Sequence, residues 1–358
     1  MQAMSESSLD ILVRKAEEGY ELTEAEVRSS ADLLASPDIS PAPKEAFLLA
    51  LAAKGETPSE IAAFAGRFRE LAVDPELDDL AEDAIDVCGT GGDKSGSFNV
   101  STFVAFTLAA GGTRVLKHGN RSITSSCGSA DLLEGVGIPL QASPNLLRMA
   151  AREINFTFFF APGFHPAFKE VMPVRQKLAE NGQRTVFNLL GPLINPARPS
   201  FQLLGVFSSQ LVDPLAETLH NLGLKRGLVV HGQLENGMGM DEIACCAKNV
   251  VSGFGNLSSI RRENWGADDF GLTPHPVEDL AGGNLEENLR ILNDLTKNRA
   301  PEGLLSTISA NAGAGFFITE KANNLREGAA MAKDLILGGE VGRWIDEVRR
   351  FYKDNIGV

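Results

Sequence analysis

Hydrophobic positions in the first eighty residues recur at helical spacing. In the segment SSLDILVRKAEEG, Leu9, Leu12 and Ala16 fall on one face of a helix. Thr23 and Glu26 have the spacing of a capping box for the next helix, and the segment TPSEIAAFAGRFREL begins with the same signals. This part of the chain therefore predicts helices and no strand.

The pattern changes at Ile85, where short apolar runs begin to alternate with helical segments. The apolar runs are AIDVC, TRVLKHG, FTFFFAP, FQLLGVFS and RGLVVHG, and the helical segments are STFVAFTLAAGG, residues 129–135, SPNLLRMA and LVDPLAETLHNLG. Strands that alternate with helices predict a parallel sheet with right-handed crossovers.

These patterns predict an α/β protein with a small all-helical N-terminal domain and a large α/β domain built on a central, mostly parallel sheet. We place the helical domain at residues 1–80 and the α/β domain at 81–358. A polar helix over about residues 166–182, HPAFKEVMPVRQKLAENG, is expected to rejoin the helical domain. Past Gly253 the only clear elements are two amphipathic helices, ANNLREGAAMAKDLILGGE and VGRWIDEVRRFY.

Composition narrows the class of protein. The chain has 358 residues, is 43% hydrophobic and carries a net charge of −14, so we expect a globular protein that does not bind nucleic acid through a phosphate-attracting surface. Its four cysteines have no spacing typical of a disulfide framework or a zinc site. No stretch approaches the length of a membrane span, and we expect a cytoplasmic protein without a membrane partner.

The first candidate site is the stretch DVCGTGGDKSGSFNVST, which follows a predicted strand and leads into a predicted helix. Glycines allow backbone N–H groups to approach an anion, and a helix N-terminus adds partial positive charge. The stretch does not match the dinucleotide-binding or P-loop motif. Phosphate binding and a tight turn without a ligand are both consistent with the glycines alone.

A second candidate loop follows the next strand. It carries Lys117, His118, Asn120 and Arg121, with Ser129 at the start of a helix. Open α/β sheets bind ligands beyond the carboxyl ends of their strands, so both loops are expected to face one polyanion. The alternative is that Lys117 is a solvated strand end and Ser129 an N-cap.

Two adjacent carboxylates follow the strand RGLVVHG. Asp241 and Glu242 repel each other unless a cation lies between them, and carboxylate oxygens suit Mg²⁺ that is shared with phosphates. A solvated helix start is the alternative interpretation of this pair. The position after a third strand favours the metal site.

Together these motifs resemble the anthranilate phosphoribosyltransferase family, which joins anthranilate to phosphoribosyl pyrophosphate in tryptophan biosynthesis. The segments that carry the resemblance are GTGGD with FNVST, KHGNR with CGSAD, HPAFK with PVR, RTVFNLLGPLINPA, the pair DEI, and NAGAGFF. They occur in family order and cover most of the chain.

The resemblance implies a role for each matching residue. Asp241 and Glu242 would hold a second Mg²⁺ ion, with Ser101 on the first, and Asn120 and Arg175 would bind anthranilate beside His118. The family also forms a homodimer through its helical side, uses no nucleic acid or membrane and shows no dedicated catalytic dyad. The residues that would hold the donor or line the site are Gly89, Gly92, Asp93, Ser97, Asn99, Val100, Ser101, Thr102, Lys117, Gly119, Arg121, Ser125 and Ser129.

The sequence departs from the family pattern at four places. The segments after Arg175 and before Asp241 are longer, Ser126 and Cys127 stand where Lys and Ser are common, and GDKSGSF differs from the usual glycine loop. Two rival functions are a pyrimidine nucleoside phosphorylase, whose glycine pattern does not match, and a noncatalytic homologue that binds nucleic acid. The acidic composition and the retained Asp241, Glu242 and Arg175 argue against the second.

Overall fold

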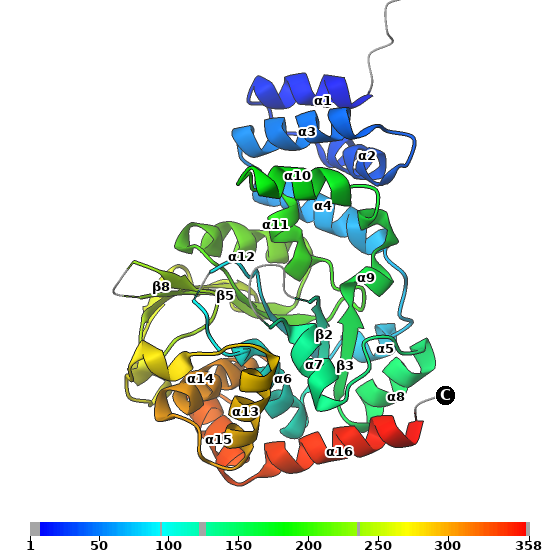
Figure 1. Cartoon of the computed structure of the whole chain (residues 1–358). Helices are drawn as coiled ribbons and strands as arrows, with labels where there is room; N and C mark the ends of the chain where they lie inside the picture. Colours follow the sequence, from blue (N-terminus) through cyan, green and yellow to red (C-terminus); the bar gives the residue numbers. More distant parts are fainter. Residues whose placement is uncertain (1–7, 94, 122–126, 235–236, 356–358) are drawn as a thin grey trace, which may run out of the picture.

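The computed structural model describes residues 8–93, 95–121, 127–234 and 237–355. Figure 1 shows a helical lobe at the top, which contains the N-terminal helices, and a larger α/β lobe below it, which contains the sheet. This arrangement confirms the predicted fold class.

The N-terminal segment is helical, as its periodicity predicts. Both expected capping boxes are present: Thr23 with Glu26, and Thr57 with Glu60. Each satisfies otherwise unpaired N–H groups at a helix start. The helices are α1 (Ser8–Glu17), α2 (Glu24–Ala35), α3 (Pro41–Lys54), α4 (Pro58–Glu70) and the short α5 (Asp78–Ala81).

The central sheet forms from the predicted apolar runs and from three strands that follow them. Its strands are β1 (Ala84–Gly89), β2 (Arg114–Gly119), β3 (Phe156–Phe160), β4 (Phe201–Gly205), β5 (Arg226–Gln233), β6 (Gly239–Met240), β7 (Lys248–Gly255) and β8 (Glu263–Trp265). Within the described residues the order is β3-β2-β1-β4-β5-β7-β8, with β6 also paired to β5. The pairs from β3 to β5 are parallel, and β6, β7 and β8 pair antiparallel. The carboxyl ends of the five parallel strands therefore meet at one edge.

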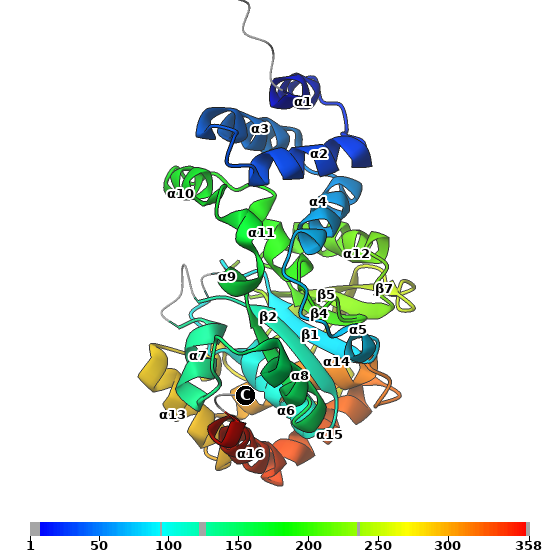
Figure 2. The ribbon, with the colours of Figure 1, turned by 90° about the vertical axis from the view of Figure 1, so that its right-hand side faces the viewer.

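Both faces of the sheet are covered by helices. Alternate residues of one strand enter different cores: Leu203 packs with the C-terminal helices, and Leu204 packs with the helical lobe. Figure 2 shows α6 and the C-terminal helices on one face and α12 on the other. The helices are α6 (Val100–Ala110), α7 (Ser129–Val136), α8 (Pro144–Glu153), α9 (Ala161–Phe164), α11 (Phe187–Leu190), α12 (Val212–Asn221), α13 (Leu285–Thr296), α14 (Glu302–Ile318), α15 (Leu325–Leu337) and α16 (Glu340–Asn355).

The prediction of one helix over about residues 166–182 is wrong. A 3₁₀ turn at Pro166–Phe168 precedes α10 (Met172–Glu180). Pro173 lies in the first turn of α10, where its missing N–H costs nothing; in the interior of a longer helix it would break the hydrogen-bond ladder.

The shortened helix α10 lies against the helical lobe. The ammonium of Lys44 on α3 donates to the carbonyl of Glu170 at 3.3 Å, and Lys177 pairs with Glu45 at 2.7 Å. Among the described residues, no helix is both long and apolar enough to cross a bilayer. The domain boundaries at residues 80 and 81 remain a proposal.

Candidate active site

The glycine loop after β1 is packed against the carboxylate loop after β5. The N–H of Gly91 donates to Asp241 Oδ2 at 2.7 Å. A Cβ at Gly89 would lie 2.2 Å from that same oxygen, and a Cβ at Gly205 would lie 1.4 Å from the carbonyl oxygen of Asp241. Gly89 and Gly205 are therefore required for the close approach of Asp241.

Two glycines of the loop adopt backbone conformations that other residues avoid. Gly91 has φ of 68° and Gly92 has φ of 80°. The outer half of the loop is fixed to a distant segment, since the N–H of Phe98 donates to the carbonyl of Leu280 at 2.8 Å and Gly282 donates to Gly96 at 2.9 Å. The loop is therefore held at both ends.

The N-terminus of α6 lies directly behind the glycine loop. The Ser101 side chain is partly buried, and the Ser101 backbone N–H and the Lys117 ammonium both favour the ionised form of Glu242. A helix N-terminus of this kind stabilises anions. Val100 and Thr102 are fully buried, so their side chains face the core and not the loop surface.

Three carboxylates are crowded at this point. Burial, followed by the charge of Asp93, raises the pKa of Asp241 to about 7. Burial, followed by the charges of Asp241 and Asp93, raises the pKa of Glu242 well above its usual value. The positive charge near these three carboxylates is too small to offset their mutual repulsion when all are ionised.

The same carboxylates fit a divalent cation. Glu242 Oε2 is buried and has no hydrogen-bond partner. A cavity of about 10 Å³, at the lower limit of the space that holds one water, is lined by Ser101, Gly205, Asp241, Glu242 and Asn311 together with apolar groups. Among the described residues no three His, Cys, Asp or Glu side chains converge to coordinate a metal by themselves. The set therefore suits Mg²⁺, whose remaining ligands are waters or phosphate oxygens.

The carboxylate loop is held from α14. Asn311 accepts from the N–H of Ile243 at 3.1 Å and donates to the carbonyl of Ile243 at 2.7 Å. Asn249 makes the equivalent pair of bonds to Ala244, at 2.8 and 3.1 Å. The buried amides therefore pair with both backbone polar groups of Ile243 and of Ala244 and fix the backbone that follows Glu242.

Lys117 lies below the loops and not at the surface. Only 1% of Lys117 is exposed, and its ammonium donates to the carbonyl of Val87 at 2.5 Å and to Ser101 Oγ at 3.4 Å. Burial lowers the pKa of Lys117, and the buried carboxylate of Asp86 opposes that shift. Lys117 therefore positions Ser101 and offsets charge beneath the site.

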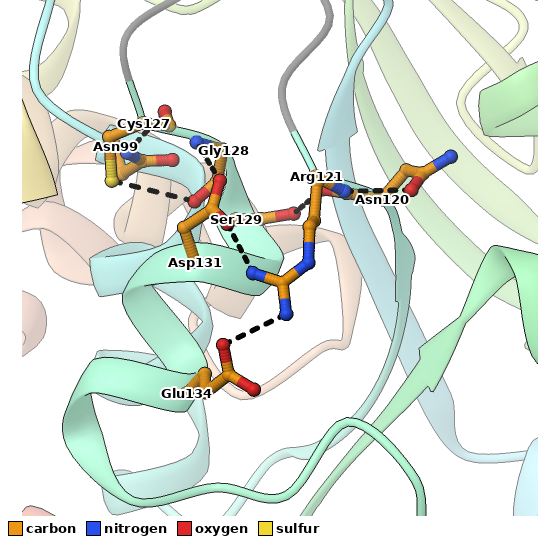
Figure 3. Close-up of polar contacts among 8 residues, drawn as sticks. All are labelled: Asn99, Asn120, Arg121, Cys127, Gly128, Ser129, Asp131 and Glu134. Atoms are coloured by element: carbon orange, nitrogen blue, oxygen red, sulfur yellow. Dashed lines mark hydrogen bonds and ion pairs between the residues drawn. The ribbon is translucent and has the colours of Figure 1, made fainter.

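The loop after β2 is connected both to the glycine loop and to α7 (Figure 3). Asn99 Nδ2 donates to the carbonyl of Cys127 at 3.1 Å. Arg121 extends toward α7, where its guanidinium binds Asp131 at 2.5 Å and Glu134 at 2.9 Å. Both terminal nitrogens of Arg121 are thus already engaged by carboxylates.

The start of α7 differs from the alternative considered for Ser129. Gly128 is the N-cap, and its N–H donates to Asp131 Oδ2 at 2.9 Å. Ser129 is the first helical residue, and its hydroxyl donates to the carbonyl of Asn120 at 3.3 Å. A Cβ at Gly119 would lie 2.7 Å from that hydroxyl oxygen, so Gly119 makes room for Ser129.

A pair of buried histidines begins a path from β2 toward the helical lobe. His118 Nδ1 lies 3.2 Å from the carbonyl of Gly191, and His118 Nε2 lies 3.2 Å from His165 Nε2. A carbonyl only accepts, so Nδ1 of a neutral His118 carries the proton and Nε2 accepts from His165. Burial lowers the pKa of His118 to about 3 and that of His165 to about 4, which keeps both rings neutral.

The path continues to Arg175 through rings that contact one another edge to face. The His165 ring centroid lies 5.6 Å from that of Phe168, and Phe168 lies 5.3 Å from Phe187. The guanidinium of Arg175 lies 5.5 Å from Phe168 and 5.0 Å from Phe187. No described carboxylate lies within ion-pair distance of Arg175, and burial lowers its pKa. The guanidinium suits a carboxylate and the neighbouring rings suit an aromatic ring, so an aromatic carboxylate is the ligand that this site favours.

The structure thus brings together most of the residues that the sequence singled out. The glycine loop, Ser101 and the two carboxylates share one site, and His118 is connected to Arg175 by aromatic contacts. Asp241 follows β6 in an irregular turn, so the helix-start interpretation of the acidic pair is wrong. Ser125 lies outside the described residues.

Comparison with known proteins fits this geometry. Residues 81–341 match the model of the glycosyl transferase family, a/b domain, and residues 9–72 match its helical bundle domain. An anthranilate phosphoribosyltransferase of Petrotoga mobilis is 38% identical over 340 residues, which cover 95% of each chain. The chain belongs to the anthranilate phosphoribosyltransferase family.

Solved structures of this family have the same fold. The anthranilate phosphoribosyltransferase of Thermus thermophilus is 40% identical, with a TM-score of 0.87 over 96% of this chain and 99% of that one. The Saccharomyces cerevisiae anthranilate phosphoribosyltransferase, solved in complex with PRPP and Mg, is 24% identical, with a TM-score of 0.83 over 98% and 99% of the two chains. The second likeness concerns the fold alone.

Sequence reasoning missed several residues of this anthranilate phosphoribosyltransferase site. Asn311 lies in the segment NAGAGFF, whose match to the family gave no hint of a contact with residue 243. His165 lies in HPAFK, where only the motif as a whole was informative. Arg184 lies in the lengthened segment after Arg175, and only its charge could have drawn attention to it.

Proposed function

We propose that the protein transfers the 5-phosphoribosyl group of phosphoribosyl pyrophosphate to the amine of anthranilate, giving N-(5-phosphoribosyl)anthranilate and pyrophosphate in tryptophan biosynthesis. The observation that carries this proposal is one site in which an under-neutralised carboxylate cluster lies beside a glycine loop and a helix N-terminus. An aromatic path leads from that site to an arginine without a carboxylate partner among the described residues.

We assign the donor to the glycine-loop side. The N–H of Gly92 and the start of α6 provide donors for phosphate oxygens, while the N–H of Gly91 is bonded to Asp241. Asp241, Glu242 and Ser101 would hold Mg²⁺, which when bound neutralises charge that develops on the departing pyrophosphate. Lys117 supports the site from below through its bond to Ser101.

We assign anthranilate to the aromatic side. Arg175 presents a planar fork that binds both oxygens of a carboxylate, and its guanidinium lies beside the contacting pair Phe168 and Phe187. His118 and His165 line the route back toward the strand ends. The amine of anthranilate is uncharged near neutral pH, so its lone pair attacks the sugar without a strong base.

Catalysis then depends on alignment more than on proton transfer. The bond from the C1 carbon of the sugar to pyrophosphate breaks while a bond from that carbon to the amine nitrogen forms, and the amine proton then passes to the released pyrophosphate or to water. Holding two substrates in register lowers the barrier by up to about 7–11 kcal/mol. The neutral histidines are consistent with such a site, because neither carries a charge that would repel a cationic sugar.

We further infer a pair of Mg²⁺ ions, a homodimer and a cytoplasmic location. The second ion is supported by the number of carboxylates, since Asp93, Asp241 and Glu242 lie close enough for their charges to interact. The dimer is supported by Ile11 and Tyr20 at the end of the helical lobe, which are 52% and 60% exposed. Four free thiols support a reducing compartment.

The direct test is an anthranilate fluorescence assay. Purified protein with Mg²⁺ and phosphoribosyl pyrophosphate should consume anthranilate and release pyrophosphate in equal amounts. Omission of either the donor or Mg²⁺ should stop both signals. Folded protein that leaves anthranilate fluorescence unchanged in the complete mixture would overturn the proposal.

A further inference from the structure

The cationic side chains near the strand ends differ in whether their N–H groups are already bound. Lys117 is bonded below the loop, Arg121 is engaged by two carboxylates, and Arg175 lies beside two rings at the far end of the aromatic path. Arg184 is exposed, and no described carboxylate lies within ion-pair distance of it. Among the described residues near the glycine loop, Arg184 is therefore a cation whose N–H groups are not bound by a carboxylate.

Arg184 is fixed at the edge of the glycine loop. Its guanidinium carbon lies 3.8 Å from the centroid of the Phe207 ring. Phe207 follows β4, and its N–H donates to the Thr90 hydroxyl in the glycine loop at 3.1 Å. A Cβ at Gly92 would lie 3.9 Å from Arg184 Nη2. Arg184 therefore lies over the loop, although it comes from the connection between α10 and α11.

The contact with Phe207 leaves the N–H donors of Arg184 free to bind a ligand. A guanidinium that lies face-on against a ring keeps its N–H donors in the plane, directed outward. Stacking also limits the rotamers of a long side chain, so less entropy is lost when a ligand binds. Gly91 and Gly92 have no side chains that would block the space beside it.

We propose that Arg184 binds the pyrophosphate group of the donor across the glycine loop and so completes its phosphate cradle from the helical-lobe side. This inference rests on the proposed transferase function. The ligand chemistry is a diphosphate, whose oxygens accept paired N–H bonds from a guanidinium. Asp93, on the same loop, makes no ion pair with Arg184 and directs its charge toward Asp241 instead.

The test compares Arg184→Gln and Arg184→Lys with the wild-type protein. The control is Arg290→Ala on α13, where the side chain is 70% exposed and pairs only with Asp294 on its own helix among the described ion pairs. KM for phosphoribosyl pyrophosphate should rise about tenfold in Arg184→Gln, and less in Arg184→Lys, while KM for anthranilate stays unchanged. Calorimetric titration with magnesium pyrophosphate should show the same order of affinities. The difference in pyrophosphate affinity between wild type and Arg184→Gln should become smaller as the salt concentration is raised.

Each outcome separates this inference from the proposed function. If wild type shows no transfer, the function fails, and the pyrophosphate titration still tests Arg184. If wild type is active but Arg184→Gln keeps the wild-type KM for the donor and the wild-type pyrophosphate affinity, the inference is overturned. Equal losses for donor and anthranilate, with no dependence on salt, would also overturn it, since that pattern indicates a general distortion.

Discussion

The side-chain amide of Asn311 pairs with both polar groups of the Ile243 backbone, accepting from its N–H at 3.1 Å and donating to its carbonyl at 2.7 Å. The two residues are 68 positions apart, and Ile243 immediately follows the acidic pair. The amide thus sets where the backbone leaves the carboxylates.

Replacing this amide should disturb the metal carboxylates. In Asn311→Leu two buried backbone groups lose their partner, so the free energy of unfolding should fall by about 2 kcal/mol or more. The Mg²⁺ concentration for half-maximal activity should also rise. Asn249→Leu, which removes the matching bonds to Ala244, should lose similar stability with a smaller change in Mg²⁺ dependence. Equal shifts of the Mg²⁺ curve in both variants would contradict a specific role for Asn311.

Gly89 should tolerate no side chain. In Gly89→Ala the new methyl group would lie 2.2 Å from Asp241 Oδ2, so the carboxylate must move. A displacement of this order should lower kcat by about a hundredfold or more. The matched control is Gly66→Ala on α4, where nothing lies within 4 Å of the added atom. Steady-state rates at saturating substrates decide the point, and a fully active Gly89→Ala enzyme would refute the packing argument.

Arg175 should act on the acceptor. Arg175→Ala is expected to raise KM for anthranilate by about tenfold, with a much smaller effect on KM for the donor, because a charge-assisted pair of bonds to the carboxylate is lost. Lys177→Ala on the same helix, which removes only the surface pair with Glu45, is the control. Equal effects on both substrates would reject the assignment.

The acidic pair should control the response to Mg²⁺. In Asp241→Asn combined with Glu242→Gln, half-maximal activity should require about tenfold more Mg²⁺, because two anionic oxygen ligands are gone. Thermal unfolding gives a second readout: Mg²⁺ with pyrophosphate should stabilise wild type and not the double variant. Superimposable Mg²⁺ titration curves would remove the pair from the metal site.

The buried histidines should make the fold sensitive to mild acid. Both pKa values lie below the ordinary value of 6.5, at about 3 for His118 and about 4 for His165. Between pH 6.5 and 4 the unfolded chain therefore takes up protons that the native state does not, and stability falls as pH falls. Each ring adds a slope of about 1.4 kcal/mol per pH unit within this window.

Urea denaturation at pH 7.5 and pH 5 measures that slope. Wild type should lose more stability between the two pH values than His118→Gln does. The pH profile of kcat should show no titration of these rings near 6.5. Parallel losses of stability in the two proteins would show that His118 titrates normally.

The sheet was predictable because its strands are short apolar runs separated by capped helices. Ile85 and Val87, for example, point to one core, and the intervening Asp86 is a buried exception that no local pattern explains. The meeting of the loops after β1, β2 and β5 also followed from topology, since parallel strands end at the same edge. Both features follow from local sequence patterns and from the general geometry of parallel sheets.

A helix that is buried on all sides, or a strand with no clear boundary in the hydrophobic pattern, was not predictable from the sequence. Helix α14 is buried on almost all sides, so its sequence has no polar stripe that marks a helix period. Strand β7 pairs antiparallel at the far side of β5, and the hydrophobic pattern past Gly253 gives no sign of where that sheet ends.

The supporting residues of the site were hidden for a different reason. The pairing of Asn311 with residue 243, and of Arg184 with Phe207, joins segments that only the folded chain brings together. The lengthened segment after Arg175 was visible in the sequence, but its length alone did not indicate where Arg184 would lie.

Arg175 lies in α10, and Arg184 follows it by nine positions, in the connection between α10 and α11. One short segment of the chain therefore carries both the arginine assigned to the acceptor and the arginine assigned to the donor. A change in the length of that segment would alter the spacing between the two contacts, even if every residue at the strand ends were kept.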